Sequence, residues 1–329
     1  MHIPDNYLSP STCAVMGAVM VPIWTRAVKK VKAEMTKKKM PLMGIGAALS
    51  FLTMMFNIPL PGGTSGHAVG GTLLAILLGP EAACISITIA LLIQALLFGD
   101  GGILAFAANS FNMAFLMPFV GFYIYKFLKK SFKSRKGENI SAFIASYIGI
   151  NAAALFAAIE FGLQPLLFKD AFGMPLYSPY PLSITIPSML LPHLLIAGVV
   201  EGIITVGVLS FIKKVSPEII YEGSSKKMRP IYALLIALIC LSPLGLLATG
   251  TAFGEWSAEE IAAVTLGGKA LGFIPKGMEN GFSLSPLMHN YSVKGLSGSL
   301  GYILSAVAGA SILLIVFRIV ASMRKDIKN

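Results

Sequence analysis

Charged residues are scarce in this chain of 329 residues. Asp, Glu, Lys and Arg together make up only 12% of it, about half the ~25% that is usual for soluble domains. Hydrophobic residues make up 55%, so the composition excludes an ordinary soluble globular protein. It predicts an all-α, polytopic membrane protein, because a helix satisfies its own backbone hydrogen bonds within the lipid.

Motifs for nucleotide hydrolysis and for covalent catalysis are absent. The chain contains no G-x-x-x-x-G-K-[ST], so it has no P-loop. It also shows no Ser/His/Asp or Cys/His arrangement that would suggest a nucleophile. Its three cysteines (Cys13, Cys84 and Cys240) lie far apart in apolar runs and form no Cys-x-x-Cys pair. We therefore expect no enzyme, no cofactor and no thiolate metal site.

A cleaved signal peptide is also missing by the usual criteria. No basic region precedes the first apolar run, and that run ends in Trp24, Arg26 and lysines rather than in a small-residue cleavage site. We therefore expect the N-terminal segment to be retained. The large side chain of His2 should also hinder removal of Met1.

Nine apolar segments are expected to form membrane helices, although one of them is short. A spanning helix needs about 20 mostly apolar residues. The candidate segments are 8–28, 41–57, 68–79, 82–98, 103–125, 140–162, 183–212, 230–248 and 299–320.

The basic residues test this count of nine. Lysine and arginine cluster at 29–39, 126–136, 213–229 and 324–328. With nine spans, all four clusters fall on one face, which the positive-inside rule identifies as the cytoplasmic face of the cell membrane. The N-terminus then lies outside and the C-terminus inside. The net charge of +11 is explained by membrane topology, so we expect the lipid bilayer as a partner and no nucleic acid.

Two of the four histidines, His2 and His67, fall on the predicted external face. A free amine at Met1, with an unperturbed pKa of about 7.7–8.0, can lose its proton and bind a metal. The backbone nitrogen and the imidazole of His2 would complete two fused chelate rings, with three nitrogens in a plane. A fourth nitrogen would give the square-planar geometry that suits Ni(II) or Cu(II). The other interpretation is that the histidine at position two has no function and follows the initiator methionine by chance.

A glycine-rich loop could supply the fourth nitrogen. Residues 61–67 read Pro-Gly-Gly-Thr-Ser-Gly-His, and glycine lets the backbone bend sharply. The next helix is short, so this loop should begin below the membrane surface, where irregular backbone is tolerated only inside protein or beside a cavity. We expect His67 to lie in a protected pocket, and the alternative is a simple turn with a surface histidine.

Polar side chains within or beside the spans form a second group of candidates. Ionisable groups cost about 2.5–3.5 kcal/mol at the centre of a spanning helix. His193 and Glu201 lie eight residues apart on the seventh span, and we interpret them as a polar pair that packs helices together or relays a proton. We expect five further polar residues to hold the metal-binding loops in place through hydrogen bonds: Asp5, Thr64, Ser65, Asn109 and Asn112.

Several of these motifs together resemble a known family. The motifs are Met-His-Ile-Pro-Asp at the N-terminus and the stretches at 61–67, 75–80, 94–102 and 108–114. They resemble the substrate-binding membrane subunit of cobalt and nickel energy-coupling-factor transporters, the CbiM/NikM family. The resemblance implies that Met1, His2 and His67 bind Ni(II) or Co(II). The family usually has glycine at the position of Asn6. Asparagine tolerates the left-handed region of backbone conformation, so we expect the backbone turn at this position to be kept.

The C-terminal third resembles the small two-helix subunit of the same transporters. Residues 273–280 are loosely similar to its Pro-Asp-Gly-Leu-Glu motif. The sequence therefore predicts a metal-binding membrane domain at 1–215, a basic cytoplasmic linker at 216–229, and a two-helix domain with an external loop at 230–329.

The resemblance also implies partners. A transmembrane coupling (T) subunit and two ATP-binding cassette ATPase subunits would drive uptake, and the spacing of Ala14 and Ala18 would let another helix approach closely. One alternative is a self-sufficient secondary carrier or channel for a divalent cation, with Glu160, His193 and Glu201 as its relay. Another is a subunit for an organic vitamin, and neither alternative needs a free Met1-His2 terminus. The sequence does not decide between nickel and cobalt.

Overall fold

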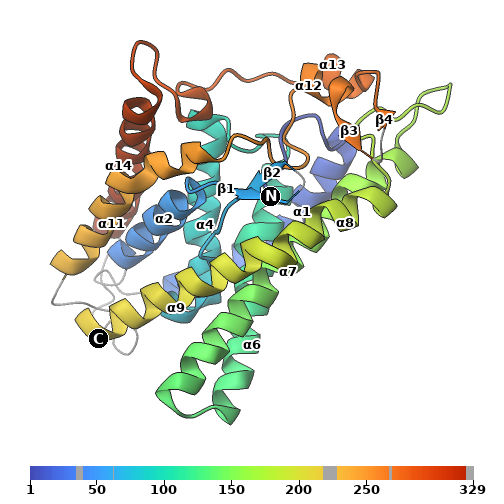
Figure 1. The fold of residues 1–329 in the computed structure, drawn as a ribbon. Coiled ribbons are helices and arrows are strands. Elements are labelled where there is room, and N and C mark those ends of the chain that lie inside the picture. Colours follow the sequence, from blue (N-terminus) through green and yellow to red (C-terminus); the bar gives the residue numbers. More distant parts are fainter. Residues whose placement is uncertain (35–39, 62, 218–227, 267–268, 324–329) are drawn as a thin grey trace.

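Helices dominate the fold. The structure, a computed structural model, describes residues 1–34, 40–61, 63–217, 228–266 and 269–323 (Figure 1). Helical residues make up 72% of the chain, which confirms the predicted all-α class. The described strands form two short antiparallel hairpins: β1 (Ile58–Leu60) with β2 (Thr64–Gly66), and β3 (Thr265–Leu266) with β4 (Lys269–Ala270).

Seven helices within the described residues are long and apolar enough to cross a membrane. They are α1 (Pro10–Glu34), α4 with η1 (Pro80–Phe98), α5 with η2 and α6 (Phe106–Ser131), α7 (Arg135–Leu167), α8 with η3 and α9 (Leu182–Val215), α11 with η4 (Arg229–Leu247), and α14 (Gly298–Met323). The predicted spans 41–57 and 68–79 correspond to shorter helices, α2 (Met40–Met54) and α3 (Gly71–Leu78). The chain is therefore a polytopic membrane protein, as its composition predicted.

Four of the long helices change their helix type along their length. The segments η1 (Gln94–Phe98), η2 (Ser110–Leu116) and η3 (His193–Ala197) are π-helical, and η4 (Ser242–Leu247) is a 3-10 helix. The adjoining α-helices are α4 (Pro80–Ile93), α5 (Phe106–Asn109), α6 (Met117–Ser131), α8 (Leu182–Pro192), α9 (Gly198–Val215) and α11 (Arg229–Leu241). A π-helical turn rotates the residues that follow it away from α-helical spacing, and such turns often occur at functional sites.

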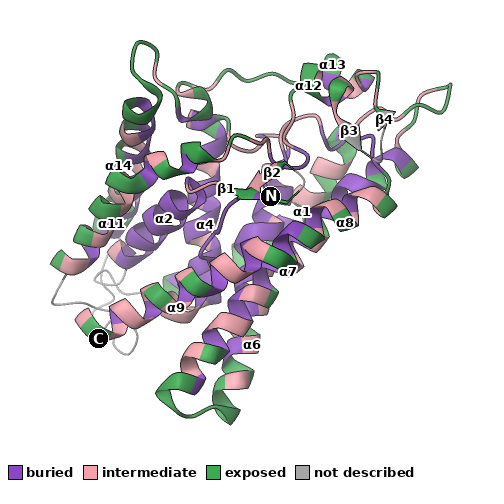
Figure 2. Ribbon diagram, in the orientation of Figure 1, coloured by how far each residue is buried: buried purple, intermediate pink, exposed green. Residues whose placement is uncertain are grey.

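Helix α2 is enclosed by protein. All of its 15 residues except Pro41 are buried, whereas α1 buries only Met20, Ala27 and Val31, and Figure 2 shows the same contrast between interior and outer helices. Because protein rather than lipid surrounds α2, its length need not match the thickness of the hydrocarbon layer.

Helix α7 holds the N-terminal half of the bundle together. It packs against α6, α8 and α9, and its N-terminus is capped by Ser134, whose hydroxyl accepts a hydrogen bond from the Gly137 backbone N–H at 3.0 Å. Gly149 leaves room for α3, since a Cβ there would lie 2.7 Å from the Thr72 hydroxyl oxygen. The short helix α3 is thereby fixed deep in the bundle, directly after the loop that carries His67.

The C-terminal part packs onto the same bundle. Helix α14 lies against α2, with Gly309 receiving the ring of Phe51. Residues 248–297, between η4 and α14, are called the C-terminal loop below and run across the top of the bundle in Figure 1. This loop contains α12 (Ala258–Ala263), the β3–β4 hairpin, α13 (Lys276–Glu279) and η5 (His289–Tyr291).

Two sequence-based expectations fall partly outside the described residues. Most of the predicted linker at 216–229 lies there, because 218–227 are not described. Residues 35–39 and 324–329, which contain part of the first basic cluster and all of the last, are not described either. The orientation of the bundle across the membrane therefore stays a prediction from the positive-inside rule.

Candidate metal centre

The N-terminus is built into the interior of the protein. Met1, His2 and Ile3 are 3%, 1% and 0% exposed, although the first residues of a chain are usually poorly ordered unless they are tied down. Asn109 ties them down: the Ile3 N–H donates to its amide oxygen at 2.8 Å, and its amide nitrogen donates to the Ile3 carbonyl at 2.9 Å. The Gly102 N–H donates to the same carbonyl at 2.9 Å.

The next two residues fix the turn that follows. The Asp5 carboxylate accepts a hydrogen bond from the Leu104 N–H at 2.7 Å. Asn6 adopts φ 68°, the left-handed conformation expected for it. Its amide pairs twice with the Phe282 backbone, donating to the carbonyl at 2.8 Å and accepting from the N–H at 2.9 Å. This exchange joins the N-terminal segment to the C-terminal loop.

His67 follows the β1–β2 hairpin and is 5% exposed. Just beyond it, the Glu201 carboxylate on α9 accepts hydrogen bonds from the N–H groups of Val69 at 2.8 Å and Gly70 at 3.1 Å. The Nδ1 of His67 lies 3.1 Å from the Ala68 carbonyl oxygen. A carbonyl can only accept, so Nδ1 carries the hydrogen and Nε2 keeps its lone pair, an arrangement typical of metal-binding histidines.

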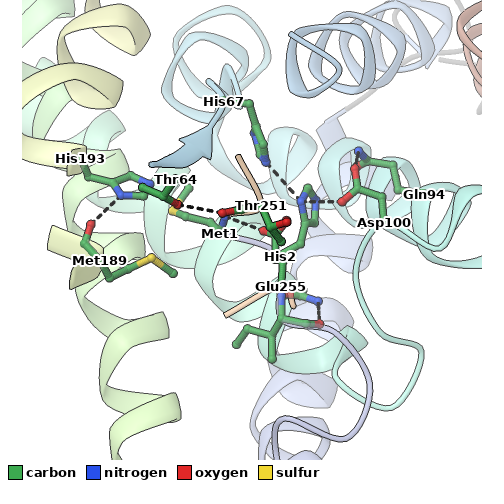
Figure 3. Close-up of polar contacts among 12 residues, drawn as sticks. Met1, His2, Thr64, His67, Gln94, Asp100, Met189, His193, Thr251 and Glu255 are labelled. Carbon is green, nitrogen blue, oxygen red and sulfur yellow. Dashed lines mark hydrogen bonds and ion pairs between the residues drawn. The ribbon is translucent and has the colours of Figure 1, made fainter. Parts of the chain in front are cut away.

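The two histidines meet through their nitrogens (Figure 3). His67 Nε2 lies 3.2 Å from His2 Nδ1. Two nitrogens that bind one metal at about 2.0 Å and at a right angle are about 2.8 Å apart, so a shift of a few tenths of an ångström would let both reach one ion. Burial, with the neighbouring His2 next in importance, holds the pKa of His67 well below its ordinary value. The ring is therefore neutral and able to bind a metal at neutral pH.

Two carboxylates flank the nitrogens, and the sequence analysis missed both. Asp100 Oδ1 lies 3.0 Å from His2 Nδ1, and Glu255 Oε1 lies 3.2 Å from the Met1 amine. Burial alone would raise the pKa of Asp100, but the charge of His2 and the hydrogen bonds from His2 and Tyr291 hold it below the usual value. The site thus combines nitrogen donors with a fixed negative charge, which favours a divalent cation.

Asp100 is itself held from two sides. Its Oδ2 accepts a hydrogen bond from Gln94 Nε2 at 3.0 Å and another from the Tyr291 hydroxyl, which belongs to the C-terminal loop. In the sequence, Asp100 is an acidic residue between two glycines in a chain with few charges. This isolation was the one pattern that could have indicated a functional role for it. Glu255 gave no such signal, because it lies 254 residues from the amine that it contacts.

The other predicted support residues take different positions. The Thr64 hydroxyl donates to the Thr251 carbonyl at 3.2 Å, so it joins the hairpin to the C-terminal loop. Ser65 pairs with Pro59 across the β1–β2 hairpin. Asn112 needs a correction: its amide donates to Glu160 at 2.7 Å, within the bundle and not on the metal-binding loops.

The predicted polar pair also needs a correction. The Nδ1 of His193 donates to the Met189 carbonyl at 2.7 Å. Glu201 instead accepts from the backbone beyond His67. The structure gives the two side chains separate partners, because eight residues of helix place them about 12 Å apart along its axis.

An open cavity gives access to this centre. It has a volume of about 730 Å³, and His67, Asp100, Glu255 and Tyr291 contribute to its walls. No cluster of three or more His, Cys, Asp and Glu side chains able to hold a metal occurs in the described part of the chain.

Two family models match successive parts of the chain. Residues 2–219 match the model of the cobalt uptake substrate-specific transmembrane region, CbiM. The chain belongs to the CbiM family. Residues 228–326 match the PDGLE domain, so a domain similar to the small CbiN-type subunit is fused to the C-terminus.

Two relatives that match nearly the whole chain are named as fused transport proteins. This CbiM protein is 52% identical over 321 residues to a probable fused nickel transport protein, LarMN, of Lactiplantibacillus plantarum, covering 97% of each chain. It is 43% identical to the fused nickel transport protein NikMN of Rhodobacter capsulatus, covering 98% of each chain. It is also 59% identical, with a TM-score of 0.62, to the crystal structure of a truncated transition metal transporter, covering 65% of this chain and 99% of that one.

Replacing Asn109 tests how far the N-terminal segment must be held in place. Asn109→Ala removes both bonds to Ile3 and leaves a buried N–H without its partner, at a cost of about 1–3 kcal/mol. We expect nickel binding to weaken about 10–100-fold, as for other residues that orient a metal ligand, when measured by equilibrium titration of the purified protein. Asn112→Ala is the matched control and should keep the wild-type affinity. Equal affinities in both variants would contradict the role of Asn109.

Proposed function

We propose that this protein captures Ni²⁺ or Co²⁺ at the outer face of the cell membrane as the substrate-specific component of an ATP-driven importer. The observation that carries the proposal is the convergence of His2 Nδ1 and His67 Nε2, 3.2 Å apart, beside a buried N-terminal amine. The metal is the transported substrate and not a resident cofactor. The names of the relatives as nickel transport proteins support this substrate class.

The proposed ligands are the Met1 amine, the His2 backbone nitrogen, His2 Nδ1 and His67 Nε2. Asp100 and Glu255 each hold a nitrogen that the metal would take, so the arriving ion must replace these contacts. The Asp100 and Glu255 carboxylates remain close enough to balance its charge. Asn109, Asp5 and Glu201 act on the backbone around the ligands and keep the two loops in register.

The ligand set also determines which metal should be preferred. Four nitrogens in a plane give a strong ligand field, from which Ni(II) gains most, whereas Zn(II) gains nothing from it and prefers a tetrahedral site. Co(II) can occupy the same plane. Cu(II) should bind at least as tightly in vitro, because affinity rises along the divalent series to copper.

A competition titration tests this preference. We expect the protein to bind Ni(II) and Co(II) and to keep its nickel in the presence of excess Zn(II), Mn(II) or Mg(II). The measurement follows the visible absorption of bound nickel, which for a planar site is a single band envelope in the yellow region. Weak octahedral bands, or loss of nickel to excess zinc, would contradict the planar four-nitrogen site.

Partner subunits follow from the missing P-loop. A coupling T subunit and two ATP-binding cassette ATPases would supply the energy of transport. A self-sufficient secondary carrier is the alternative, and it needs a continuous proton or ion relay. The separate partners of His193, Glu201 and Glu160 provide little support for such a relay.

Reconstitution into lipid vesicles distinguishes these two functions. The purified chain alone should bind nickel, hydrolyse no ATP and accumulate little metal inside the vesicles. Addition of the T subunit, both ATPases and ATP should produce sustained uptake of ⁶³Ni²⁺. Robust uptake by the chain alone under an ion gradient would favour the secondary carrier.

A further inference from the structure

A third buried histidine lies beside the proposed centre and has no role in it. His193 is 4% exposed and begins the π-helical segment η3 within the long helix that runs from α8 to α9. In Figure 3, Met1 lies between the His193 ring and the His2–His67 pair. Helices often contain a π-helical turn at functional sites, so the buried imidazole of His193, next to the proposed metal-binding terminus, is a candidate for a function of its own.

The hydrogen bonding of His193 sets its tautomer. Nδ1 lies 2.7 Å from the Met189 carbonyl oxygen, which can only accept, so the ring hydrogen is on Nδ1. The lone pair is then on Nε2, the nitrogen that lies on the side of Met1 and Thr64 in Figure 3. His67 is oriented in the same way by the Ala68 carbonyl. A backbone carbonyl that fixes one ring nitrogen of a histidine is a common feature of metal ligands.

A small cavity separates His193 from the N-terminus. Its volume is about 10 Å³, and its walls include Met1, Ser65, Met189 and His193. This is about the room that one water molecule needs, and a desolvated metal ion is no larger. The cavity is therefore suited to a single small guest between Met1 and the imidazole of His193.

We propose that His193 Nε2 is a second binding position for the transported metal, to which the ion passes from the four-nitrogen centre. The inference rests on the proposed function. A metal–Nε2 bond to His193 forms while the bond to His67 Nε2 breaks, and the Met1 amine and both His2 nitrogens stay bound throughout. No proton or electron has to move in this exchange.

The chemistry of planar Ni(II) explains why such a residue is useful. A planar chelate holds its ion tightly, and its ligands exchange mainly after a fifth ligand has been added from above or below the plane. A nearby neutral imidazole is a suitable fifth ligand, since it binds nickel well. His193 would thus speed entry and release while contributing little to the affinity at equilibrium.

The test compares the exchange rate with the affinity in His193→Gln. Glutamine has a similar volume and can still donate to the Met189 carbonyl, but its amide is a poor metal ligand. We expect the nickel affinity to stay within about twofold of wild type and the visible band to be unchanged, which also shows that the variant folds. Transfer of nickel to excess EDTA, followed by stopped flow, should slow at least tenfold. The matched control Met20→Leu removes a thioether at a buried position on α1 that lines no part of this cavity, and it should exchange at the wild-type rate.

Two outcomes would overturn the inference. Exchange at the wild-type rate in His193→Gln would show that the residue takes no part in transfer, and loss of the visible band would place it in the equilibrium site instead. Both differ from failure of the proposed function, in which the wild-type protein itself would show no nickel band. As an independent measurement, the residual weak nickel binding of a His67→Ala protein should disappear when His193→Gln is added. Unchanged residual binding would also count against the proposal.

Discussion

His67→Ala is expected to weaken nickel binding by more than about a hundredfold. Residues that only orient a metal ligand are commonly worth 10–100-fold in affinity, so loss of one of four ligands should exceed that range. The three nitrogens that remain of the four-nitrogen centre come from the N-terminal residues, and His2 Nδ1 loses the partner that lies 3.2 Å away. The measurement is equilibrium binding of Ni²⁺ to the purified protein, together with the visible spectrum of the bound metal.

The chain offers a matched control for this change. His289 lies in the C-terminal loop, is exposed and lines the outer wall of the open cavity. His289→Ala therefore removes a histidine near the centre that is not one of the proposed ligands, and it should bind nickel normally. The unfolding temperature of both variants should be recorded, because His67 is buried. Wild-type affinity in His67→Ala would show that the histidine pair is not the metal centre.

Extending the chain before Met1 should abolish tight nickel binding. Two added residues, Gly-Ser, convert the Met1 amine into an amide and carry the free amine away from His2. The packing reinforces the effect, because Met1 is 3% exposed and its nitrogen lies 3.2 Å from Glu255. An added residue therefore has to displace the terminus from its pocket. Titration with Ni²⁺ should show no tight, stoichiometric binding.

The same Gly-Ser pair added to the C-terminus is the control for this experiment. It keeps the length and composition of the extended protein and leaves the amine of Met1 free, so full binding is expected. Mass spectrometry must first establish that Met1 is retained in the control and that the added residues remain in the extended protein. Tight nickel binding by the N-terminally extended protein would refute the chelate.

Local sequence signals predicted the placement of most helices. The sixth predicted span, 140–162, lies within α7, which extends to Arg135–Leu167. The earlier start agrees with Ser134 as N-cap, a signal that hydropathy alone does not contain. The short predicted segment 68–79 is α3, and its shortness correctly indicated that His67 lies in a protected place.

Side chains near the π-helical segments were harder to assign. Asn109 and Asn112 are three residues apart, a spacing that places both on one face of an α-helix. The segment η2 begins at Ser110, so Asn109 contacts Ile3 whereas Asn112 contacts Glu160. No pattern in the sequence marks where a helix changes its winding, and the predicted support role of Asn112 was wrong for this reason.

The contacts that the C-terminal loop makes with the candidate centre could not be predicted from the sequence. Glu255 and Tyr291 reach the centre from the C-terminal loop. Their positions depend on how α14 packs against α2, which motif spacing does not encode. The proposed ligands could be named from the sequence because the amine, His2 and a glycine-flanked His67 have a chemistry that can be read from residue types, and their metal binding stays a prediction.

The fusion of two domains in one chain changes how strongly they must attract each other. The C-terminal loop meets the N-terminal segment through single contacts, such as the Asn6–Phe282 exchange and the Tyr7 hydroxyl on the Trp256 carbonyl at 2.8 Å. Each such bond contributes only about 0.5–1.5 kcal/mol, so these bonds alone hold the loop on the N-terminal segment weakly, and the packing of α14 against α2 anchors the rest of the domain. A covalent connection raises the effective concentration of the loop to the millimolar range, at which a few weak bonds suffice. Every copy of the metal centre is then made together with its own loop, in a fixed one-to-one ratio.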